Sequence, residues 1–246
     1  MSLDFAPAFA RYEALAAEAD ALFAKVADAC PGMLPCAPGC GDCCHALFDL
    51  TFVEALYLNH QFTRAFPAGP GREAVLDRAD RADRALCKRK RQAFREDAQG
   101  VSTAVILEEL ARERVRCPLL DDHDRCLLYA ARPITCRLYG APLLIGGAAR
   151  TCGRTGFEPG GAYPTVKIET IQDRLLELSR ELVAALPTRL VAMGDMLVPV
   201  SMALLTTYDA AYLGLVPEAA EAGAEPAGDS CGGATTWVLP GPEDKA

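Results

Sequence analysis

Hydrophobic side chains recur at alternating spacings of four and three residues along the first thirty residues of the chain. This spacing gives an α-helix one apolar face, which we expect to pack against a core or a partner helix. Pro31 and Gly32 then end the predicted helix near Cys30. The apolar positions are Ala8, Tyr12, Leu15, Ala19, Leu22 and Val26.

A capping box at Thr51 and Glu54 predicts where a second helix begins. In this motif the threonine hydroxyl caps the third backbone N–H of the helix, and the glutamate side chain reaches back to the threonine N–H. We expect this helix to end before Pro67, and Gly69-Pro70-Gly71 to form a turn.

Repeated Asp-Arg-Ala triplets mark a third helix, expected from about Glu73 to Glu96. Their charges predict exposure, so we interpret residues 73–97 as a long helical arm. Gly100 interrupts the arm, and a shorter helix is expected from Ser102 to about Arg114.

Two short apolar runs flank an acidic tip between Cys117 and Cys126, a pattern typical of a β-hairpin or a tight knuckle. Pro133 suits the first turn of the helix expected next, where its missing N–H costs nothing. Cys136 would then lie near the positive end of the helix dipole, which favours a thiolate.

The last third of the chain predicts further helices. An amphipathic helix is expected from about Lys167 to Leu186, and residues 188–216 should be helical in pieces. The apolar stretch 196–216 contains Pro199 and Asp209, so we interpret it as buried helix and not as a membrane span. The loops should include Gly146-Gly147 and residues 153–161, and from Pro217 onward we expect a disordered tail with Trp237 as its one large apolar anchor.

These elements predict a mainly α fold: a helical domain with a small cysteine-rich metal-binding core and one short β-hairpin or knuckle. The expected parts are an N-terminal helix (1–30), a cysteine-cluster metal-binding domain with the helical arm (31–160), C-terminal helices packed on it (161–216) and the tail (217–246).

The composition and net charge of the chain argue against some classes of function. The 246 residues carry a net charge of −8, which argues against general nucleic-acid binding. The basic run Lys88-Arg89-Lys90-Arg91 is interpreted as a solvated helix face. The N-terminus has no basic segment followed by an apolar one, so we expect a cytoplasmic protein without a secretory signal.

Eleven cysteines carry most of the functional information. In a cytoplasmic chain, disulfides are disfavoured and metal binding or redox chemistry is favoured. Cys30, Cys87 and Cys231 stand alone and are interpreted as ordinary thiols. The other eight fall into two groups, in which several sulfurs can converge on zinc or on an iron–sulfur cluster. The candidate metal ligands are Cys36, Cys40, Cys43 and Cys44, followed by Cys117, Cys126, Cys136 and Cys152.

Other polar residues are weaker candidates for a role in metal binding or catalysis. His45 and His123 could substitute as ligands. Arg132 and Arg137 flank Cys136 and could hydrogen-bond sulfur or pair with nearby acids. The candidate acids and bases, which we also read as a helix cap and an acidic turn, are Glu54, Asp121, Asp122 and Asp124.

Taken together, these motifs resemble the YkgJ-type cysteine-cluster family, described as a zinc- or iron-chelating domain. The resemblance covers Cys36 to about Cys152. It rests on the run C-x3-C-x2-C-C ending at Cys44, on Cys117-Pro118-Leu119, on Cys126-x2-Tyr129 and on the segment Arg132-Pro133-x2-Cys136-Arg137-x-Tyr139. The resemblance implies a small, mainly helical domain with one metal centre. Family members are often labelled iron–sulfur oxidoreductases, and some resemble flagellin lysine-methylases.

We therefore expect a cysteine-cluster metalloprotein that binds an iron–sulfur cluster and has a redox or electron-transfer role, with an unidentified redox or protein partner. The alternative is a zinc-binding structural or metal-handling module. A second alternative is a protein-modifying enzyme of the lysine-methylase type. The residues identify no catalytic group.

Overall fold

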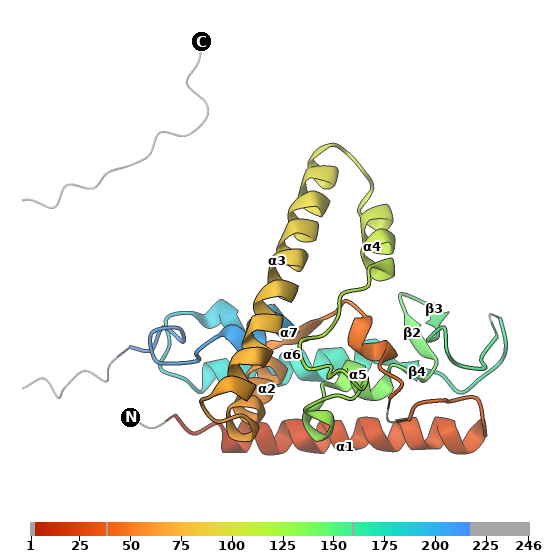
Figure 1. The fold of residues 1–246 in the computed structure, drawn as a ribbon, viewed down its shortest axis with the longest axis horizontal. Coiled ribbons are helices and arrows are strands. Elements are labelled where there is room, and N and C mark those ends of the chain that lie inside the picture. Colours follow the sequence, from red (N-terminus) through yellow and green to blue (C-terminus); the bar gives the residue numbers. More distant parts are fainter. Residues whose placement is uncertain (1–2, 38, 159, 217–246) are drawn as a thin grey trace, which may run out of the picture. The chain divides into compact units, whose positions relative to one another are not determined.

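The fold is described by a computed structural model that covers residues 3–37, 39–158 and 160–216, and these are mainly α-helical, as the sequence predicts. The predicted tail, with Trp237 and Cys231, lies outside the described residues. The α-helices, drawn in Figure 1, are α1 (Ala6–Ala29), α2 (Phe52–Ala65), α3 (Pro70–Ala98), α4 (Thr103–Arg112), α5 (Ile134–Leu138), α6 (Ile168–Ala184) and α7 (Val200–Leu205). The 3₁₀-helices are η1 (Asp42–His45), η2 (Tyr129–Ala131) and η3 (Val191–Asp195).

Helix α1 packs against α2, α5 and α6, and its predicted apolar face is the face that it buries. Tyr12, Leu15, Ala19 and Val26 are buried. Burying such a face is what stabilises an amphipathic helix in a protein. Helix α1 also contacts α5, the short helix on which Cys136 lies, and Figure 1 shows the two helices close together.

The capping box at the start of α2 is confirmed. The backbone N–H of Thr51 donates to Glu54 Oε2 at 3.2 Å, and the Thr51 hydroxyl donates to the same oxygen at 3.1 Å. The other carboxylate oxygen of Glu54 accepts a hydrogen bond of 3.1 Å from the backbone N–H of Ile134, at the start of α5. One buried carboxylate therefore ties the N-termini of two helices together.

The arm forms as predicted, but its ends differ from the prediction. Helix α3 begins at Pro70, so the expected turn at Pro70-Gly71 is wrong, because proline at the first helical position is pre-set for the helix. Helix α4 ends at Arg112, and residues 113–117 continue as extended or irregular backbone. The Arg89 guanidinium joins the two helices by ion pairs of 3.0 to 3.2 Å to carboxylates of Glu96, Glu109 and Glu113.

Two small sheets flank the helices. Strand β1 (Asp49–Thr51) pairs antiparallel with β5 (Leu197–Pro199). In the other sheet, β2 (Leu143–Ile145) pairs antiparallel with β3 (Ala148–Arg150) and parallel with β4 (Val166–Lys167). The loop expected at Gly146-Gly147 is instead the two-residue turn of the β2–β3 hairpin, since both glycines have positive φ, the geometry of a type I′ turn.

The predicted C-terminal helix α6 is confirmed, whereas the stretch after it is only partly helical. Within 196–216, α7 is the one α-helix, and Met196 and Leu197 are exposed, so the expectation of a buried helix across this stretch is wrong. Pro199 explains the break, because it ends β5 and precedes the first turn of α7. In the described part of the chain, every helix is too short or too polar to cross a membrane.

Candidate functional site

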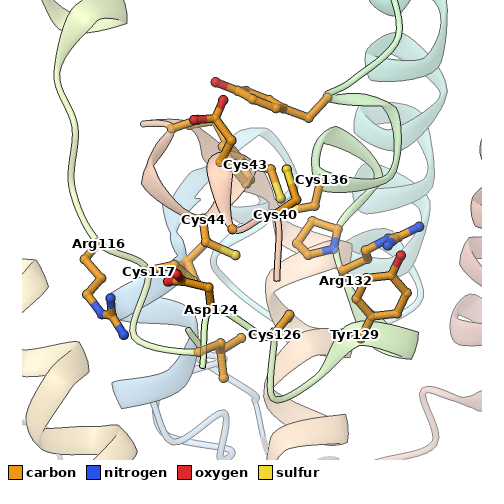
Figure 2. Close-up of a pocket in the computed structure, with 18 of the residues that line it drawn as sticks. Cys40, Cys43, Cys44, Arg116, Cys117, Asp124, Cys126, Tyr129, Arg132 and Cys136 are labelled. Atoms are coloured by element: carbon orange, nitrogen blue, oxygen red, sulfur yellow. The ribbon is translucent and has the colours of Figure 1, made fainter. Parts of the chain in front are cut away.

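One cavity of about 360 Å³ brings together all eight candidate cysteines, although they come from separate segments of the chain (Figure 2). The loop of residues 36–44 lines one side, and η1 at its end carries Cys43 and Cys44. Gly41 precedes η1 in the left-handed conformation, with φ of 57°, which glycine adopts without strain. The eight cysteines of the cavity are Cys36, Cys40, Cys43, Cys44, Cys117, Cys126, Cys136 and Cys152.

Backbone pairing joins the two cysteine groups. The N–H of Cys117 donates to the carbonyl of Cys44 at 2.7 Å, and the N–H of Val115 donates to the carbonyl of His45 at 3.1 Å. A single antiparallel bridge between Ala46 and Arg114 continues this pairing. The segment after α4 therefore runs beside η1 and places the Cys117 thiol next to the Cys44 thiol.

The predicted knuckle brings Cys126 close to the thiols of Cys44 and Cys117. Leu120 and Cys126 form an antiparallel bridge, and the N–H of Leu127 donates to the carbonyl of Leu119 at 2.8 Å. The knuckle between Cys117 and Cys126 is thus confirmed as a tight antiparallel turn without a longer strand. Helix α5 supplies Cys136 from the other side, and Figure 2 shows its sulfur beside that of Cys43.

Five of the thiols contact one another, and they compete for protons. The Cys43 thiol accepts hydrogen bonds from Cys136 and Cys44, which hold the pKa of Cys43 well below that of an ordinary thiol. Cys44 also meets Cys117 and Cys126 through hydrogen bonds, and these contacts raise the pKa of Cys44 strongly. The contact with Cys44 lowers the pKa of Cys126. Neighbouring thiols of this group therefore influence one another's pKa.

Cys136 differs from the sequence-based prediction. Its place in the first turn of α5 favours a thiolate, but its pKa is raised, because its thiol hydrogen-bonds to Cys43 and because it is buried. The contact with the Cys43 sulfur and the partial burial of Cys136 act against the dipole of this five-residue helix. The acceptor of the pair is Cys43.

We call the other three cysteines of the cavity, Cys36, Cys40 and Cys152, the outer group. The Cys36 sulfur lies against Gly140, where a β-carbon would come within 2.4 Å of it. Although Cys36 as a whole is exposed, desolvation of its thiol raises the pKa of this group. The Cys152 thiol donates to Asp42 Oδ2 at 3.0 Å, and burial together with this bond raises its pKa to about 11. The Arg114 guanidinium pairs with the other oxygen of Asp42 at 2.7 Å.

The inner five thiols, Cys43, Cys44, Cys117, Cys126 and Cys136, have the donor chemistry of a thiolate-bound metal centre. Across residues 3–37, 39–158 and 160–216, no three histidine, cysteine, aspartate or glutamate side chains are arranged to hold a metal ion as they stand. The sulfurs meet in pairs instead. A bound cation would deprotonate the thiols that coordinate it.

The two arginines that flank Cys136 are held by α1. Arg137 Nη1 lies 2.5 Å from Asp20 Oδ2, and Arg132 Nη2 lies 3.7 Å from Asp20 Oδ1. The Arg132 guanidinium stacks on the Tyr129 ring, 4.0 Å from its centroid (Figure 2). Its positive charge also favours the thiolate forms of Cys43 and Cys126, as the lowered pKa values of these thiols reflect.

Among the remaining candidates, Glu54, Asp121 and His45 have structural partners, whereas Asp124 lines the cavity (Figure 2). Glu54 caps α2 and contacts α5. Asp121 Oδ1 accepts backbone hydrogen bonds of 2.8 Å from His123 and Arg125, so it holds the knuckle tip. The ring of His45 meets the Gly41 carbonyl oxygen at 3.1 Å through Nδ1. These contacts favour the cap and turn interpretations of the acids.

Four residues of the site were not predicted as part of it: Asp20, Asp42, Arg114 and Gly140. Asp42 lies inside the cysteine loop, and Gly140 directly follows the Arg-x-Tyr motif, so their positions in the sequence were a usable signal. Asp20 and Arg114 come from α1 and from the segment after α4, and only the tertiary structure reveals their contacts. Outside the cavity, Cys30 ends α1 and Cys87 lies exposed on α3.

Comparisons with protein-family models, with curated proteins and with solved structures found no match to this chain. The resemblance to the YkgJ-type family therefore remains a proposal that rests on the motif residues.

Proposed function

We propose that the protein is a cysteine-cluster metalloprotein that binds an iron–sulfur cluster and has a redox or electron-transfer role. The observation that carries this proposal is the contact among five thiols from three segments of the chain inside one cavity. The inner thiols would hold the centre, and the outer group would line its approach. A bound cluster would supply one-electron transfer, at a potential set by its type, its hydrogen bonds and its exposure.

Three features support a cluster over a single ion. The inner group offers more sulfurs than the four that a cubane cluster requires. The cavity is much larger than the space that one ion fills between four sulfurs at about 2.3 Å. Arg132 brings a positive charge toward the thiols, and such a charge offsets the negative charge that thiolates and sulfides accumulate.

Zinc is the second candidate, supported by the direct contacts between neighbouring thiols. Sulfurs around one zinc ion are in mutual contact, since all four bind the same atom. Such a site would be structural or would handle metal. The lysine-methylase alternative depended on Glu54 and the acidic turn as acids or bases, and their capping contacts give it no support.

Elemental analysis of anaerobically purified protein tests the proposal. We expect iron and acid-labile sulfide in similar amounts, a brown colour and visible sulfur-to-iron absorption. A colourless protein with stoichiometric zinc would support the second candidate and contradict the first.

A further inference from the structure

The cavity extends beyond the thiols into an apolar chamber. Four parts of the chain form its wall: the middle of α3, the residues before β1, the segment after α4 and the start of α7. Most of the apolar side chains that line it are only partly buried, and Phe48 and Val200 among them also pack against the core. The apolar chamber residues are Leu47, Phe48, Ala82, Leu86, Val115 and Val200.

A ring of contacts holds these walls together. Lys90 on α3 pairs with Asp49 on β1 at 2.9 Å, and β1 pairs with β5, which leads directly into α7. Ser201 on α7 closes the ring, because its hydroxyl donates to Asp83 on α3 at 3.1 Å. The chamber is therefore a built feature with walls fixed on several sides, and not a gap beside a loose segment.

Two polar side chains on the chamber wall, Ser201 and Arg116, already have protein partners. Ser201 bonds to Asp83, and the Arg116 guanidinium donates to the carbonyl oxygen of Asp121 at 2.7 Å. A charged or strongly polar ligand would lose its water without gaining these groups as partners. An apolar ligand breaks no hydrogen bonds with water when it enters, and apolar cavities in proteins can take up molecules such as benzene.

We propose that this chamber binds a small, neutral, apolar molecule next to the thiol group. The whole cavity of about 360 Å³ lies at the lower end of the range of small-molecule sites, so the ligand is small. The binding of this molecule does not depend on the proposed function. Any action of the metal centre on the molecule does rest on the proposed function. A purely structural metal site would require no such chamber.

The test is binding of the neutral fluorescent probe N-phenyl-1-naphthylamine to the full chain as purified, with metal content measured on the same samples. We expect saturable enhancement of its fluorescence in the wild type. Ala82→Phe places a ring in the chamber, and it should weaken binding at least about tenfold. Ala85→Phe adds the same ring to the exposed face of the same helix and should change binding less than about twofold.

A further variant and a measurement of thermal stability make the test conclusive. Ala82→Leu adds less volume and should weaken binding by an intermediate factor, while thermal unfolding verifies that each variant is folded. Equal binding by the Ala82 and Ala85 variants, or no saturable binding by the wild type, would overturn the proposal. A protein that binds the probe but contains no metal would contradict the proposed function alone.

Discussion

The backbone N–H of Cys117 donates a 2.7 Å hydrogen bond to the carbonyl oxygen of Cys44. The two cysteine groups are therefore joined by the main chain, and not by their sulfurs alone. The helices around them bury a continuous apolar core, which includes Tyr12, Phe52 and Leu138. Metal binding should thus add stability to a fold that already exists.

Metal removal is expected to lower the melting temperature without unfolding the helices. Small zinc modules unfold without metal because they lack a core, and this chain has one. Far-UV circular dichroism and thermal unfolding, before and after chelation under reducing conditions, measure both effects. Loss of the helical signal on chelation at room temperature would contradict the expectation.

Glu54→Gln should destabilise the protein by about 1–3 kcal/mol. Both oxygens of the Glu54 carboxyl group accept hydrogen bonds from backbone N–H groups, and glutamine would place its NH₂ group, which only donates, against one of them. Urea unfolding measures the change in the free energy of unfolding. Glu73→Gln, in the exposed first turn of α3, is the matched control and should change it by less than about 0.5 kcal/mol. Equal effects of the two substitutions would show that Glu54 does not join α2 to α5.

The stability that Glu54 contributes should fall as pH rises. Burial raises the pKa of Glu54, so the folded chain keeps this proton at pH values where the unfolded chain has released it. The contribution is complete below the ordinary carboxyl pKa of about 4.3 and is lost as pH rises through the raised value. The difference in unfolding free energy between the wild type and Glu54→Gln should therefore be larger near pH 5 than near pH 8. A difference that grows with pH would reverse this assignment.

The local elements could be predicted from the sequence because their signals are local. The face of α1, the capping box at Thr51 and the knuckle at Cys117 depend on residues within a few positions of one another. The start of α3 at Pro70 was missed because a proline that can open a helix was read only as part of a turn. The Gly146-Gly147 hairpin was missed in the same way, since these glycines were read only as loop residues.

The arrangement of the site depends on contacts that sequence patterns do not contain. The sequence is enough to select the eight candidate cysteines. Their division into inner and outer groups depends on the pairing of Cys117 with Cys44 and on the contact of Cys152 with Asp42. The protonation of Cys136 also depends on a partner from another segment, Cys43. The helix dipole is therefore one of several influences on the protonation of Cys136.

Gly140→Ala should move the Cys36 sulfur and leave the metal centre in place. A β-carbon at this position would lie 2.4 Å from Cys36 Sγ, which must rotate away. We expect unchanged metal content and faster alkylation of Cys36 by iodoacetamide, followed by peptide mass spectrometry. Gly156→Ala, whose β-carbon would meet Met33 at an ordinary 3.5 Å, is the control. Loss of metal in Gly140→Ala alone would move Cys36 into the ligand set.

The central claim is that both cysteine groups hold one metal centre through the inner thiols. The most direct measurement is metal per chain in Cys44→Ser, Cys117→Ser and the exposed-cysteine control Cys87→Ser, each purified anaerobically. We predict that the first two variants both lose most of the metal and its absorption, while Cys87→Ser matches the wild type. Two variants that each keep about half of the metal, or that keep all of it, would contradict a single shared centre.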